Sequence, residues 1–131
     1  MDVLVSSESY GWAKRKVGEA NITLSRYLTD ERDGNALLIS SLAGAREALM
    51  YLQTGSPRGS YDVHLLRAGG QISSEYERLL SYIDGAIEVA ERFEERSTTL
   101  YSLAFALVST VGDLVDTAGA LWDLEKKTKS S

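Results

Sequence analysis

The chain has 131 residues, a formal net charge of −5, one histidine and no cysteine. Its length allows one domain with one hydrophobic core, which we place at residues 1–131, and 44% apolar with 25% charged residues is an ordinary globular composition. The lack of cysteine excludes disulfides, thiolate metal ligands and cysteine nucleophiles, and the acidic balance disfavours a dedicated nucleic-acid-binding protein.

The first predicted helix covers residues 7–28. Its apolar residues recur at alternating spacings of three and four, which places them on one helix face. They are Tyr10, Ala13, Val17, Ala20, Leu24 and Tyr27. Trp12 and Ile22 lie off this face, and we expect them to serve a second contact. The polar residues 29–35, with Gly34 among them, predict the turn that follows.

The second predicted helix covers residues 35–54. Its core face is formed by Leu38, Leu42, Ala45, Leu49 and Leu52. Small residues around Gly44 make part of this helix thin, so we expect a neighbouring helix to approach closely there. Gly55 stands where a C-cap glycine belongs and Pro57 follows, which predicts the end of the helix. After this turn we expect a short extra helix near residues 62–68.

The third predicted helix begins near Ser74, because Ser74 and Glu77 have the spacing of a capping box. Its core face is formed by Tyr76, Leu79, Ile83, Ala86, Ala90 and Phe93. Acidic residues crowd the opposite side, where we expect a solvated face. Glu88 and Arg92, four residues apart, form a favourable pair.

The fourth predicted helix covers about residues 98–127. One apolar face is formed by Leu100, Leu103, Leu107, Val111, Leu114, Ala118 and Leu121. Around residues 100–108 the other faces are apolar too, with Tyr101, Ala104, Phe105 and Val108. A helix that is apolar all round is buried, so this one lies either at the centre of the monomer or against a second copy.

The third and fourth patterns share one unbroken heptad register from residue 76 to residue 121. A single helix over residues 75–127 would be roughly 80 Å long, whereas a compact chain of this length has a radius of gyration of about 14 Å. Ser97, Thr98 and Thr99 can cap a new helix. We therefore expect a break near residue 97 and an all-α fold, an antiparallel four-helix bundle; one long helix would instead indicate a rod-like protein.

The residues give little support to a catalytic or metal site. One histidine without cysteine or a Glu-x-x-His motif argues against a zinc or di-iron centre, and we expect no metal and no cofactor. The glycine-rich residues 68–73 match neither phosphate-binding pattern. The longest apolar run, residues 103–108, is far shorter than the roughly 20 residues of a membrane span, and the N-terminus has no signal-peptide pattern. We expect a soluble, cytoplasmic protein without membrane contact.

Arg58 and His64 are the one candidate catalytic pair. A histidine can act as a general base near neutral pH and an arginine can hold a phosphate, so together they could cut RNA without a metal. A solvated loop arginine and a packed histidine explain the same residues, and we assign no catalytic residue. Arg46, Arg58 and Arg67 lie in the net-positive section of the chain and are the possible contacts for an anion or nucleic acid.

The layout resembles the HEPN superfamily of small helical domains over roughly residues 10–95. The stretches GWAKRKVGEANITLSRYL and NALLISSLAGAREALMYLQTG are similar to its first two helices, and SPRGSYDVHLLRAGG to its connection and short third helix. The resemblance implies a helical bundle, commonly dimeric, with a role in RNA cleavage, nucleotide binding or partnership with a nucleotidyltransferase. The catalytic mark of the ribonuclease branch, Arg-x4–6-His in a later helix, is not in the expected place, because no histidine follows His64. We therefore expect an inactive member.

These observations favour a non-enzymatic helical module that self-associates as a homodimer or higher homo-oligomer, with room for a protein partner. The fourth helix would lie in the interface or in the core. Three alternatives stay open: a HEPN-type metal-independent ribonuclease or toxin that uses Arg58 and His64, a small helical subunit of a nucleoprotein complex, and a structural protein of a filament or viral coat.

Overall fold

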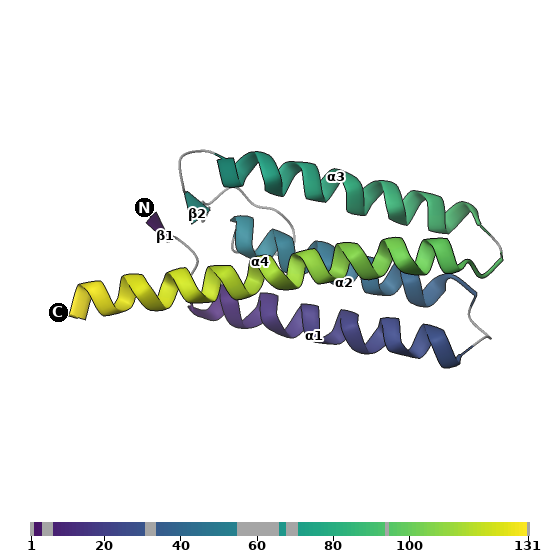
Figure 1. The fold of residues 1–131 in the computed structure, drawn as a ribbon, viewed down its shortest axis with the longest axis horizontal. Coiled ribbons are helices and arrows are strands. Elements are labelled where there is room, and N and C mark those ends of the chain that lie inside the picture. Colours follow the sequence, from purple (N-terminus) through teal and green to yellow (C-terminus); the bar gives the residue numbers. More distant parts are fainter. Residues whose placement is uncertain are drawn as a thin grey trace.

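The computed structural model describes residues 2–3, 7–30, 34–54, 66–67, 71–93 and 95–130. Its elements are β1 (Asp2–Val3), α1 (Ser7–Thr29), α2 (Ala36–Thr54), β2 (Leu66–Arg67), α3 (Gln71–Arg92) and α4 (Thr98–Ser130). The four helices run alternately up and down the long axis, and the C-terminal part of α4 projects beyond the others (Figure 1). The predicted all-α, antiparallel four-helix bundle is confirmed.

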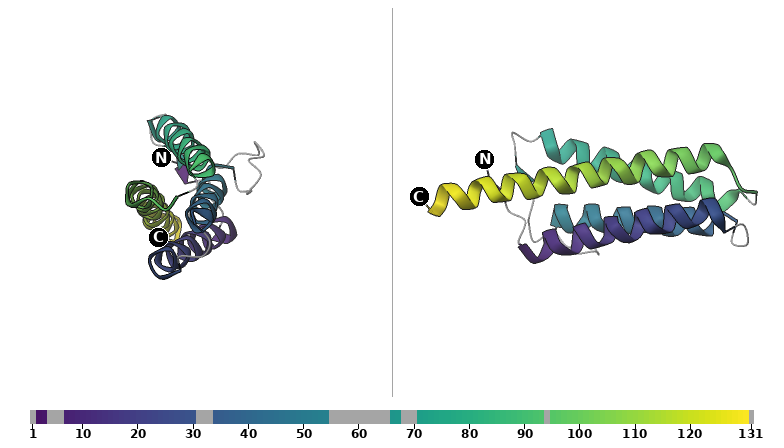
Figure 2. Two further views of the ribbon diagram at one scale, coloured as in Figure 1. Left: turned by 90° about the vertical axis from the view of Figure 1, so that its right-hand side faces the viewer. Right: turned by 60° about the horizontal axis from the view of Figure 1, so that its bottom comes forward.

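Helix α2 lies in the middle of the bundle. Seen end-on, α3, α2 and α1 form a row, and α4 lies next to this row on one side (Figure 2). Helix α4 packs mainly against α2 and α1 and much less against α3. This unequal packing leaves α3 and α4 loosely joined along their length.

The core faces predicted for the first two helices are confirmed. In α1, Tyr10 and Val17 are half-buried and the other predicted residues are buried, while the whole predicted face of α2 is buried. The thin part of α2 also brings α1 close, because a Cβ added at Gly44 would lie 3.4 Å from the Cβ of Ala20. Trp12 makes a second contact, with its ring stacked on Tyr51 at 6.1 Å between centroids.

The break between α3 and α4 is confirmed, and a single helix over residues 75–127 does not form. Helix α3 ends at Arg92 and α4 begins at Thr98. The Ser97 hydroxyl accepts the Leu100 N–H at 3.2 Å, which gives α4 the serine N-cap that the sequence predicts. The predicted pair on α3 is also present, with the Arg92 guanidinium donating to the Glu88 carboxylate.

One predicted helix start and two predicted core positions are wrong. Helix α3 begins at Gln71, so Ser74 lies inside the helix and is not its cap. Phe93 directly follows the last residue of α3. Its carbonyl accepts a hydrogen bond from Asn35, but its side chain is 54% exposed. On α4, Ala104 is fully buried whereas Leu103 is 42% exposed. The heptad register, which contains residue 104, therefore describes α4 better than the predicted face.

The short extra helix predicted near residues 62–68 is contradicted at Leu66 and Arg67. These two residues form β2, which pairs antiparallel with β1 in the register Val3 to Leu66 and Asp2 to Arg67. A seven-residue helix satisfies few of its own backbone groups and nucleates at a cost, whereas the strand pairing offers partners from the N-terminal segment. The other residues of the predicted helix lie outside the described residues.

A buried polar network fastens the two turns at one end of the bundle. The Asn35 side chain, 5% exposed, donates from Nδ2 to the carbonyls of Phe93 (3.0 Å) and Glu95 (2.9 Å). Its Oδ1 accepts the Tyr27 hydroxyl at 3.2 Å, and that hydroxyl accepts the Ser97 N–H at 2.9 Å. The turn after α1 is thereby tied to the turn before α4.

Arg96 adds a charged clamp to the same end. Its guanidinium lies 4.0 Å from the centroid of the Tyr27 ring and donates to the carbonyls of Tyr27 and, at 3.0 Å, Asp30. Tyr101 stacks on the same Tyr27 ring, with the two ring centroids 5.7 Å apart. The last carbonyls of α1 thus receive a cation, which also complements the negative end of the helix dipole.

Candidate functional site

Helix α4 exposes two large apolar side chains, Leu103 and Phe105, while most of its other described apolar residues face the core. Its segment Thr98–Ala120 has a mean hydropathy of 1.4 over its most apolar window, and 33% of that window is buried inside the bundle. By length and composition this segment could cross a membrane. One side of it is nevertheless core, since Ala104, Val108 and Val111 are fully buried.

The exposed side of α4 begins with a long stretch that carries no charge. Residues 98–112 read TTLYSLAFALVSTVG, and the first charged residue is Asp113. The exposed members of this stretch are Thr98, Thr99, Ser102, Leu103, Phe105, Ala106 and Thr110. Exposed helix faces in soluble proteins are normally studded with charges, so four turns without one are typical of a surface that meets another protein or lipid.

An apolar groove separates α4 from α3. Its volume is about 310 Å³, and it is lined by Arg78, Leu79, Tyr82, Leu107, Thr110 and Leu114. Leu79 and Leu107 are nearly buried and form its floor, while Tyr82 is 58% exposed at its edge. The groove follows directly from the loose packing of the two helices.

Exposed apolar residues extend this groove toward the α3–α4 turn. Tyr82 and Val89 lie seven residues apart on one face of α3, and Phe93, directly after the helix, continues that spacing with its N–H bonded to the Val89 carbonyl; all three are exposed. On α4, Leu103 lies one turn before Leu107 on the same side. We call this surface the α3/α4 face and define it as Tyr82, Val89, Phe93, Leu103, Leu107 and Leu114.

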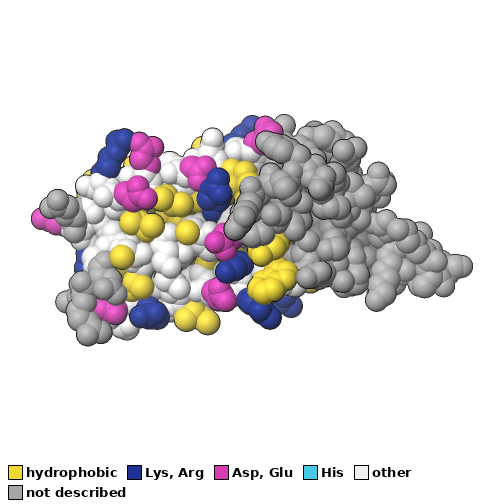
Figure 3. Space-filling model, turned by 180° about the vertical axis from the view of Figure 1, so that it is seen from behind, with side chains coloured by type: hydrophobic (Ala, Val, Ile, Leu, Met, Phe, Trp, Pro, Cys, Tyr) yellow, Lys and Arg dark blue, Asp and Glu magenta, His cyan; other side chains and the backbone are white. Residues whose placement is uncertain are grey.

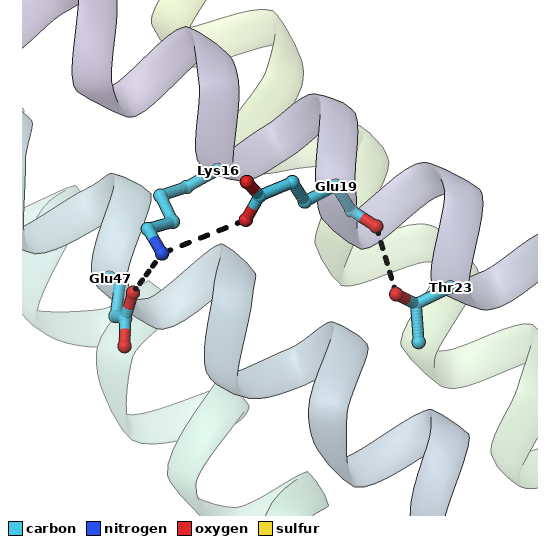
Figure 4. Close-up of polar contacts among 4 residues, drawn as sticks. All are labelled: Lys16, Glu19, Thr23 and Glu47. Carbon is cyan, nitrogen blue, oxygen red and sulfur yellow. Dashed lines mark hydrogen bonds and ion pairs between the residues drawn. The ribbon is translucent and has the colours of Figure 1, made fainter.

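The groove between α1 and α2 has a different character. Lys16 Nζ on α1 lies 3.1 Å from Glu47 Oε2 on α2 and 3.6 Å from Glu19 Oε2, and Thr23 donates to the Glu19 carbonyl (Figure 4). The hydrogen bond to Glu47 is the main cause that raises the pKa of Lys16. The charges in this groove satisfy one another, which indicates a structural ion-pair cluster.

The groove between α1 and α4 is polar as well. It is lined by Lys14, Val17, Asn21, Val108, Ser109, Gly112, Asp113, Val115 and Asp116.

The face opposite α4 carries positive and negative side chains interspersed among apolar ones (Figure 3). Of the three grooves described, the one between α3 and α4 has the apolar lining that suits a protein contact.

The structure brings together few of the predicted site residues. Arg46 lies on α2, and its Nε donates to Asp84 Oδ1 on α3 at 2.8 Å, so an internal carboxylate already occupies part of this guanidinium. Arg67 lies in β2, and its side chain is not among those described. Arg58 and His64 fall outside the described residues, so the predicted catalytic pair stays a prediction.

Tyr76 is the buried titratable group that the sequence did not single out. Its side chain is fully buried, and its hydroxyl has no hydrogen-bond partner in the part of the chain that the structure describes. Burial raises the pKa of this phenol. Across the same residues, no group of three or more His, Asp or Glu side chains is placed to hold a metal ion.

No protein-family profile, curated protein or solved structure matches this chain. The sequence predicted only part of the α3/α4 face. It indicated that α4 is apolar all round, but it assigned Phe93 and Leu103 to the core. The uncharged stretch of residues 98–112 is the signal that could have identified this surface.

Proposed function

We propose that this protein is a non-enzymatic helical interaction module that self-associates through the exposed side of α4. The observation that carries the proposal is the exposure of large apolar side chains in an uncharged stretch of α4: Leu103 is 42% and Phe105 52% exposed, and residues 98–112 carry no charge. Covering apolar area releases roughly 25 cal/mol per Å², so such a surface drives association in water.

A lipid bilayer is the alternative partner for the exposed side of α4. Insertion would pull Ala104, Val108 and Val111 out of contact with the other helices, and it would place Asp113 and Asp116 at membrane depth. Each aspartate at the centre of a spanning helix costs about 2.5–3.5 kcal/mol on insertion scales. The net charge of −5 also opposes adsorption to anionic lipid. These terms favour a protein partner over a bilayer.

Sedimentation velocity of the purified chain in detergent-free buffer tests the proposal. We expect the average mass to rise with concentration between about 1 and 100 μM, the range in which a weak self-association is populated. A chain that stays monomeric throughout this range would contradict self-association. Co-sedimentation with liposomes, in place of self-association, would assign the surface to lipid.

A further inference from the structure

We draw no further inference here: the strongest candidate, the apolar groove between α3 and α4 with Leu79, Leu107 and Leu114 in its lining, carries none, because nothing in the structure shows what covers it.

Discussion

Replacement of Asn35 by alanine tests the account of how the two turns are fastened. The change deletes the hydrogen bonds from Asn35 Nδ2 to Phe93 O and Glu95 O and the acceptor for the Tyr27 hydroxyl. A buried hydrogen bond contributes about 0.5–1.5 kcal/mol net, so three predict a loss of about 3 kcal/mol. The two carbonyls are only partly buried and regain some water, which lowers the expected loss to about 2–3 kcal/mol.

Urea unfolding followed by far-ultraviolet circular dichroism measures this loss. All variants are compared at one protein concentration, because dimerisation would otherwise add its own stabilisation. Asn21→Ala, at an exposed site on α1, is the matched control and changes the free energy of unfolding by no more than about 0.5 kcal/mol. If Asn35→Ala costs no more than this control, the network does not fasten the turns.

A double-mutant cycle with Tyr27→Phe then isolates the Tyr27–Asn35 contact. We expect a coupling free energy of about 0.5–1.5 kcal/mol, because the two side chains share a hydrogen bond of 3.2 Å. Strict additivity of the two substitutions would mean that the hydroxyl finds an equal partner elsewhere once Asn35 is gone.

Four further substitutions test the core, the cap of α4 and two glycines. Tyr76→Phe removes a buried hydroxyl without a described partner and raises the free energy of unfolding by about 1–2 kcal/mol. Because burial raises the pKa of Tyr76, the stability of the wild type also falls as the pH rises above about 10. Urea unfolding at several pH values detects a smaller fall in the variant. Ser97→Ala removes the N-cap of α4 and costs about 1 kcal/mol by the same assay. A Cβ at Gly119 would overlap the Tyr10 ring, so Gly119→Ala lowers the melting temperature, whereas Gly85→Ala, where a Cβ meets nothing within 4 Å, raises it slightly.

The sequence predicted the helices well because their core faces follow helical periodicity. The breaks were also predictable where local chemistry marks them, as at Ser97 before α4. The start of α3 was missed because a capping box can occur inside a helix, and Ser74 lies three residues beyond Gln71. The pairing of β1 with β2 joins residues more than sixty positions apart, which no local pattern reveals.

The candidate surface was harder to predict than the fold. Periodicity shows which residues share a helix face, but the distance between two helices depends on how all four pack. The contact between α3 and α4 is loose because α4 packs mainly against α2 and α1, and Leu103 on α4 stays exposed. The network of Tyr27, Asn35 and Ser97 is equally a product of tertiary structure.

The mass of the natively purified chain tests the central claim most directly. Native mass spectrometry at tens of micromolar reports the copy number and any bound protein or nucleic acid together. We predict a species of twice the 14.3 kDa chain mass with nothing else bound. A single chain of 14.3 kDa at these concentrations, or a complex in which a different protein or a nucleic acid covers α4, would contradict the claim.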